Sequence, residues 1–377
     1  MKKSLFLLSL VIFVSCQAPK EQADLLLVNA NIYTVDESFG KAEAMAVKDG
    51  KILAVGSTDD IKARYEGTEW VDAAGKTVIP GIIDAHCHFY GLGLNQLKVD
   101  LVGTRSFEEV LERVRTFQEQ NPSNFIQGRG WDQNDWEVKE FPTKEELDRL
   151  FPDTPVALER VDGHAYLVNQ KALDLAGITE KTRVSGGEII KKDGKITGVL
   201  VDNPMYMIDA IVPPPTREMD IKALKDAEAL CVDYGLTTVN DAGLMRGTIE
   251  LIDSLQQAGD LSIRVYAMVS NSSENVDHFL EKGIVKTDRL NVRSVKVYGD
   301  GALGSRGAAL REPYSDQPGH FGAMVTPVED IEALAMRLAS SEYQMNTHAI
   351  GDSANIAVLR AYEKALAGKP DRRWKIE

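Results

Sequence analysis

The sequence has 377 residues, of which 44% are hydrophobic and 27% are charged, so it can bury a large core, and long disordered regions are excluded. Its formal net charge is −14, and no basic cluster stands out that could neutralise phosphate groups. A nucleic-acid partner is therefore excluded, and the length fits one large domain with a smaller attachment.

The first residues predict export and attachment to a membrane. "MKKSLFLLSLVIFVSC" places two lysines before an apolar run that is too short to span a bilayer, the order typical of a secretory signal. Its "FVSC" ending resembles the lipobox of bacterial lipoproteins, in which the cysteine, here Cys16, is lipidated and becomes N-terminal. We expect residues 1–16 to be this signal and 17–22 a tether, with the protein anchored on the periplasmic or cell-surface side. An ordinary signal peptide cut near Ser15 is the alternative.

The pattern of residues 23–80 predicts a small β-sandwich module. Short alternating runs are separated by glycine turns, and "KDGK" at 48–51 lies between two of them, which is a strong β-hairpin signal. The cysteines that remain after Cys16, namely Cys87 and Cys231, fall on separate predicted elements outside this module, so no disulfide framework is expected.

The rest of the chain, residues 81–377, alternates strands and helices, which predicts parallel βαβ units. After the apolar run that ends in the histidine pair, strands are expected at 236–243, 262–270, 293–301, 343–352 and 373–377. Helices are expected at 218–234, 247–258, 274–282, 329–341 and 353–367. The predicted fold class is α/β, a (β/α)8 TIM-type barrel of which six strands are present. Because the last predicted strand begins where the sequence stops, we expect the sequence to be a piece of a longer chain.

Residues 100–217 do not follow this alternation. They contain "FIQGRGWDQNDW", "TPVALERVDGHAYLVN" and the hairpin-like "GGEIIKKDGKITGVLVD". We predict that this segment is an insertion after the first barrel strand, lying over the mouth of the barrel.

Two histidines end the first barrel strand, in "DAHCHF". Side chains alternate along a strand, so His86 and His88 share one face and Cys87 takes the other. Neutral imidazole is a good zinc ligand, and catalytic sites lie at the carboxyl ends of barrel strands. The pair therefore predicts a metal site, against the alternative of two hydrogen-bonded core histidines.

Two later strands direct further polar side chains inward. The alternation of "SVKVYGDG" places Lys296 inside the barrel, where a bare ammonium is unfavourable, and carboxylation by CO₂ would turn it into an anionic metal ligand. "QMNTHAIGD" directs His348 to the inner face as a further ligand. The alternatives are a Lys296–Asp300 ion pair at the mouth and a buried, hydrogen-bonded histidine.

An inward HxH pair, a lysine on the fourth strand and a histidine on the fifth resemble the amidohydrolase superfamily. The stretches "PGIIDAHCHF", "KVYGDGALGSRGAAL", "THAIGD" and "RWKIE" are similar to its YtcJ-like branch, amidohydrolase family 3, which also contains N-substituted formamide deformylases. The resemblance runs in order from about residue 23 to 377.

The resemblance implies one or two divalent metals, with zinc expected, and a small-molecule substrate. It implies a further histidine ligand and a general-base aspartate beyond Glu377. His164, in a motif near the substrate, is a candidate substrate-binding residue, as are Asp300 and Arg306 after the fourth strand. Arg306 paired with Asp300 or Glu312 is the alternative.

The reaction expected from the resemblance is hydrolysis of an amide, N-acyl or N-formyl C–N bond by metal-activated water. A deaminase, a cyclic-imide hydrolase and an esterase of the same superfamily are alternatives, because loops set specificity. A membrane-anchored binding lipoprotein without catalysis is an alternative from another class. Assembly into a homo-oligomer stays open.

Overall fold

The computed structural model describes residues 19–369 and 371–377. The chain divides into two compact units, and the boundary along the sequence lies between Gly81 and Ile82. The predicted signal, including Cys16, lies outside the described residues. Within the described ranges, no helix is both long enough and apolar enough to cross a membrane.

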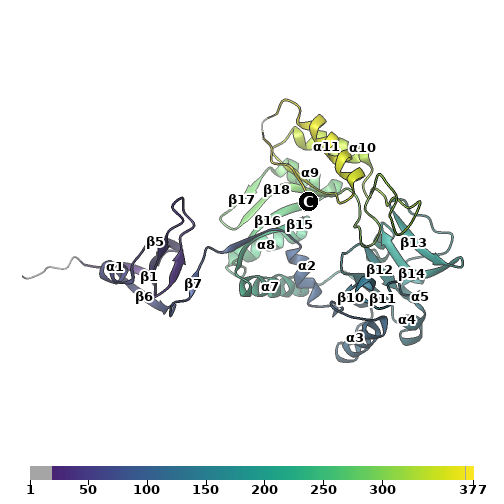
Figure 1. Ribbon diagram of the computed structural model, residues 1–377, viewed down its shortest axis with the longest axis horizontal. Helices are drawn as coiled ribbons and strands as arrows, with labels where there is room; N and C mark the ends of the chain where they lie inside the picture. Colours follow the sequence, from purple (N-terminus) through teal and green to yellow (C-terminus); the bar gives the residue numbers. More distant parts are fainter. Residues whose placement is uncertain (1–18, 370) are drawn as a thin grey trace, which may run out of the picture. The chain divides into compact units, whose positions relative to one another are not determined.

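The first unit is a pair of small β-sheets with one helix (Figure 1). One sheet has the order β5-β4-β1-β6, from β1 (Glu21–Val28), β4 (Ala44–Lys48), β5 (Lys51–Gly56) and β6 (Tyr65–Asp72). The other has the order β3-β2-β7, from β2 (Asn31–Tyr33), β3 (Lys41–Ala42) and β7 (Thr77–Val78). The predicted "KDGK" hairpin is confirmed, with Asp49 and Gly50 both at positive φ in the turn between β4 and β5.

Sequence analysis missed helix α1 (Thr58–Arg64) in this unit. Its N-cap signal is Ser57, whose side chain accepts a hydrogen bond from the backbone N–H of Asp60 at 3.1 Å. At only seven residues, the helix is too short for its apolar spacing to stand out.

The second unit is built on a curled sheet of six parallel strands in the order β8-β15-β16-β18-β19-β20, with β17 antiparallel beside β18. The strands are β8 (Ile82–Cys87), β15 (Leu236–Leu244), β16 (Arg264–Ser270), β17 (Val285–Lys286), β18 (Leu290–Tyr298), β19 (Gln344–His348) and β20 (Lys375–Ile376). Parallel strands that neighbour each other in chain order are the pattern of a TIM-type barrel, so the predicted fold class and its six strands are confirmed.

Five helices between these strands cover one face of the sheet (Figure 1): α7 (Arg217–Asp233), α8 (Arg246–Ala258), α9 (Ser273–Lys282), α10 (Val328–Ala339) and α11 (Asp352–Leu366). On β18, Val295 and Val297 are buried in the core between sheet and helices, whereas Lys296 takes the opposite face. The alternation expected for a parallel strand therefore selects which side chains reach the inner face.

The predicted insertion is a mixed six-stranded sheet of order β13-β14-β12-β11-β10-β9. Its strands are β9 (Val99–Asp100), β10 (Ile126–Trp131), β11 (Val156–Arg160), β12 (Ala165–Val168), β13 (Gly187–Lys192) and β14 (Lys195–Asp202). Its helices are α3 (Phe107–Gln120), η1 (Gln133–Asp135), α4 (Glu145–Leu150), α5 (Gln170–Leu175) and α6 (Met205–Asp209). Trp131 is fully buried in its core and donates its indole N–H to the carbonyl of Leu158 at 2.8 Å.

Helix α2 (Phe89–Asn95), which directly follows the histidine pair, packs closely on α7. A Cβ at Gly93 would overlap the backbone carbonyl of Ala223 on α7, whereas a Cβ at Gly91 would meet nothing closer than 3.4 Å. Helix α2 therefore has room for a side chain at position 91 but not at position 93.

We predict that Gly93→Ala destabilises the protein by about 1–3 kcal/mol, because α2 must move away from α7. Gly91→Ala is the matched control and should be neutral or stabilising by up to about 1 kcal/mol, since alanine favours helix. Urea unfolding of both variants measures the difference, and equal stabilities would contradict the close helix contact.

Candidate functional site

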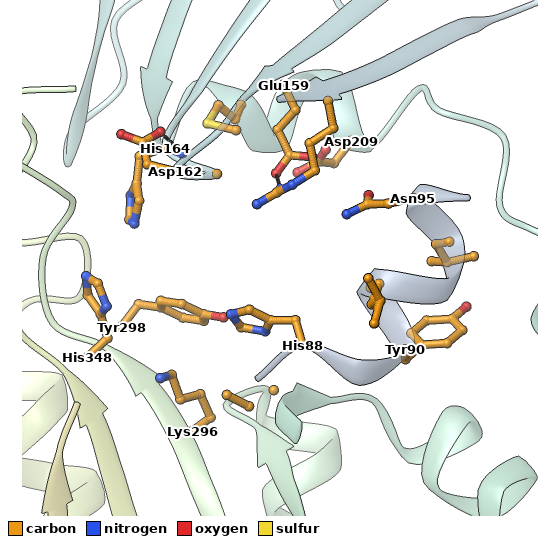
Figure 2. A pocket seen from close by; sticks show the side chains of 18 of the residues that line it. His88, Tyr90, Asn95, Glu159, Asp162, His164, Asp209, Lys296, Tyr298 and His348 are labelled. Carbon is orange, nitrogen blue, oxygen red and sulfur yellow. Dashed lines mark hydrogen bonds and ion pairs between the residues drawn. The ribbon is translucent and has the colours of Figure 1, made fainter. Parts of the chain in front are cut away.

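Polar side chains of the second unit line one cavity of about 630 Å³. Residues at the carboxyl ends of β8, β15, β18 and β19 form one side, and residues of the insertion face them across the cavity (Figure 2). Active sites of TIM-type barrels lie at this end of the strands. The cavity is therefore the candidate active site.

The histidine pair lies at the end of β8. His86 is on the strand and His88 is the N-cap of α2, and their ring centroids are 5.8 Å apart with nearly perpendicular planes. Asp241 on β15 supports this helix start, because its carboxylate accepts the backbone N–H of Tyr90 at 2.9 Å. Burial, followed by the charge of Lys296, lowers the pKa of His88 to about 4. Its imidazole is therefore neutral at pH 7, the form that binds metal ions.

Lys296, His86 and Glu377 form a compact cluster on the inner face. The side chain of Lys296 is 1% exposed, and its Nζ lies 3.0 Å from Oε2 of Glu377. Nδ1 of His86 lies 3.0 Å from the same oxygen. Burial lowers the pKa of Lys296, and Glu377 opposes that shift. Burial alone would raise the pKa of Glu377, but His86 and Lys296 outweigh it and lower the value to about 2. One carboxylate thus compensates the buried ammonium.

Across the cavity, the insertion contributes a histidine–aspartate pair. Nδ1 of His164 lies 2.7 Å from Oδ1 of Asp202, whose side chain is 4% exposed. The ring of His164 stacks on that of His348, with centroids 5.4 Å apart (Figure 2). Side chains at Gly301 or Gly307 would overlap the Asp202 carboxylate. The glycine-rich loop after β18 therefore makes room for a residue of the insertion.

The pKa values of the two stacked histidines are shifted in opposite directions. Burial by itself would lower the pKa of His164, but Asp202, with Asp162 and Asp300, outweighs it and raises the pKa above the ordinary 6.5. Burial and the neighbouring His164 lower the pKa of His348. His348 is therefore the neutral member of the stack at pH 7, and His164 is the one that favours a proton.

A polar wall closes the insertion side of the cavity. Arg129 on β10 is paired with Glu159 on β11, and the ammonium of Lys98 lies 4.0 Å from the same glutamate. The phenol of Tyr166 donates to Asp209 at 3.0 Å. These groups give the cavity hydrogen-bonding positions opposite the barrel strands, which can orient a ligand.

The structure places Asp300 and Arg306 away from the cavity lining. Asp300 is fully buried and accepts the backbone N–H groups of Ala309, Ile350 and Gly351 at 2.7–2.9 Å, so it joins the loops after β18 and β19. The alternative Lys296–Asp300 pair is replaced by Lys296–Glu377. Arg306 pairs with Asp316 at 2.7 Å, which is neither partner expected from the sequence. Contact of either residue with a substrate stays a prediction.

The free cysteines and the two remaining histidines lie outside the cavity lining. Cys87 packs against the core beneath the helices, and burial raises the pKa of its thiol, which makes it unreactive. Both Cys87 and Cys231 are free thiols. His320 bonds the carbonyl of Arg306 at 2.8 Å, and His278 lies on α9 near Glu250.

Sequence analysis missed two carboxylates of this site. Asp202 ends a hairpin strand of the insertion, and no local spacing links it to His164, 38 residues earlier. Glu377 was treated as part of a strand start, although alternation from Lys375 already directs it inward.

Comparison with known proteins is consistent with this geometry. A model described as "Amidohydrolase family" matches residues 69–376, and an imidazolonepropionase-like composite domain of bacteria matches residues 44–65. The chain belongs to the amidohydrolase family.

Relatives of this chain include enzymes by name. The chain is 34% identical to the putative amidohydrolase YtcJ of Bacillus subtilis, covering 88% of this chain and 64% of that protein. It is 28% identical to the N-substituted formamide deformylase of Arthrobacter pascens, covering 91% of this chain and 66% of the relative. An uncharacterized metal-dependent hydrolase from Pyrococcus horikoshii superposes with a TM-score of 0.69 at 29% identity, covering 93% and 69% of the two chains. The chain thus spans less than two thirds of these curated relatives.

The chemistry of the cavity fits a divalent metal. The imidazoles of His86, His88 and His348 line the cavity and are ligands that divalent ions bind. Oε1 of Glu377 is buried without a hydrogen-bond partner. Among the described residues, however, no three His, Cys, Asp or Glu side chains converge as tightly as a metal requires.

We predict that Asp202→Asn lowers the pKa of His164, because burial then acts without the carboxylate that opposes it most strongly. A pKa raised in the folded state adds stability below the unfolded value of about 6.5, and that stability is lost as pH rises through the folded pKa. The stability lost by the variant should therefore be larger at pH 5.5 than at pH 9.

Histidine NMR titration of chelator-treated protein, with urea unfolding at both pH values, measures these effects. Asp174→Asn, on the exposed side of α5, serves as the control. An unchanged His164 titration in Asp202→Asn would show that the pair is not formed.

Proposed function

We propose that this amidohydrolase is part of a metal-dependent enzyme that hydrolyses a C–N bond of an amide, N-acyl or N-formyl compound. The observation that carries the proposal is the meeting of His86, His88, Lys296 and His348 at one cavity in a chain of this family. The similarity to an N-substituted formamide deformylase favours this bond among those that the family cleaves.

The residues proposed to hold the metal are His86, His88 and His348, with Lys296 as a fourth ligand if its amine is carboxylated. Zinc is the proposed ion because the donors are mostly imidazoles. A bound divalent ion would supply an activated water and polarise the carbonyl of the substrate. The neutral state of His88 and His348 is the protonation state that such binding requires.

The remaining cavity residues are proposed to bind and orient the substrate. His164 faces the barrel side from the insertion and is held by Asp202, so it can hydrogen-bond the reacting group. The Arg129–Glu159 pair and Tyr166 lie on the insertion side and are proposed to contact the distal part of the substrate. Burying both ends of a small molecule between the barrel strands and the insertion would keep bulk water, apart from the activated molecule, away from the reacting bond.

Anchoring through Cys16 on the non-cytoplasmic side of a membrane is also proposed, on the N-terminal sequence alone. It would place the reaction outside the cytoplasm. Globomycin-sensitive processing and labelling of Cys16 by a radioactive fatty acid would test it, and an unlabelled mature protein would contradict it.

We predict that His86→Ala and His88→Ala each remove bound zinc and lower hydrolysis of N-benzylformamide by at least about 10³-fold in the protein at its full natural length, because metal-activated water supplies most of the rate. Metal content by plasma mass spectrometry and release of benzylamine measure the two effects. Chelation should abolish turnover in the natural protein, and added zinc should restore it.

His278→Ala is the matched control, since it removes an imidazole on α9 away from the cavity lining. It should keep both zinc and activity. Retained zinc and turnover in the His86→Ala, His88→Ala double variant would refute the proposed function.

A further inference from the structure

One buried carboxylate oxygen of Glu377 contacts both a proposed metal ligand, His86, and the amine of Lys296. The side chain of Glu377 is 8% exposed, and its Oε2 lies 3.0 Å from Nδ1 of His86 and accepts a hydrogen bond from Nζ of Lys296 at 3.0 Å. Its Oε1 lies 3.4 Å from Nζ of Lys375 and makes no hydrogen bond.

The backbone fixes Glu377 on the inner face. Its N–H donates to the carbonyl of Thr347 at 2.9 Å, and its carbonyl accepts the N–H of Ala349 at 3.2 Å. Both contacts continue the ladder in which Thr347 pairs with Ile376. Alternation along this ladder directs the carboxylate toward Lys296 and His86.

A carboxylate on one ring nitrogen of a histidine decides what the other nitrogen can do. When Oε2 accepts a hydrogen bond from Nδ1–H of His86, the neutral ring carries its lone pair on Nε2. Metal-binding histidines are usually oriented by such a carboxylate, which fixes both the tautomer and the ring plane.

We propose that Glu377 is a positioning residue that holds His86 in the Nδ1–H tautomer, so that Nε2 is presented to a divalent metal. The inference rests on the proposed function, because it gives His86 the role of a ligand. Lys296, as long as its amine is not carboxylated, is the second partner of the same oxygen and holds the carboxylate in place.

The test compares zinc affinity by competition with a chromophoric chelator in the natural protein and in two Glu377 variants. Glu377→Leu removes the acceptor and should weaken zinc binding about 10–100-fold. Glu377→Gln keeps an oxygen that can accept Nδ1–H and should retain most of the affinity. Loss of all zinc in both variants would make Glu377 a direct ligand and overturn the inference, as would unchanged affinity in Glu377→Leu.

A second comparison separates positioning from simple charge neutralisation. If Glu377 acted only by neutralising Lys296, Glu377→Leu would be harmless once Lys296→Met has removed the ammonium. The inference predicts that Glu377→Leu still weakens zinc binding about 10–100-fold relative to the single Lys296→Met variant.

Nitrogen-15 NMR of the histidine rings in chelator-treated natural protein gives a readout that needs no variant. His86 should be protonated at Nδ1 and bare at Nε2, and the reverse tautomer would overturn the inference even if Glu377→Leu fails to fold. If the natural protein binds zinc more weakly in Glu377→Leu but hydrolyses no amide, N-acyl or N-formyl compound, the proposed function is contradicted and the inference stands.

Discussion

The buried ammonium of Lys296 is the constraint on which the site depends. The side chain of Lys296 is 1% exposed, so its ammonium needs an anion nearby. Glu377, which directly follows the edge strand β20, supplies that carboxylate. That carboxylate also contacts His86. Charge compensation thus links β18, β8 and the residue that follows β20 across the inner face, although no two of these strands are neighbours in the sheet.

The same logic explains how the insertion becomes part of the site. Asp202 is nearly fully buried and is paired with His164, and both belong to the insertion. Its carboxylate lies where Gly301 and Gly307 leave space, so the loop after β18 closes against it. His164 is thereby stacked on His348, which belongs to the barrel sheet. Specificity and metal chemistry can therefore be supplied by different parts of the fold and still meet in one cavity.

Much of this fold follows from the sequence because parallel strands and their helices leave a strong periodic pattern. The six strands, the five covering helices and the inward direction of Lys296 follow from alternation and the 3.6-residue period. Long-range pairing leaves no such pattern. Asp202, Glu377 and the three backbone partners of Asp300 depend on how loops and strand ends meet, which local sequence does not encode. The same reason explains why Arg306, aimed at a substrate by sequence analysis, is paired with Asp316.

Anomalous diffraction at the zinc absorption edge, from crystals of the protein at its full natural length, tests the central claim most directly. The account predicts a single dominant site or an adjacent pair within bonding distance of His86 and His88, inside the cavity that His348 also lines. An anomalous peak on the helix-covered face, or one bound only by surface residues, would contradict it.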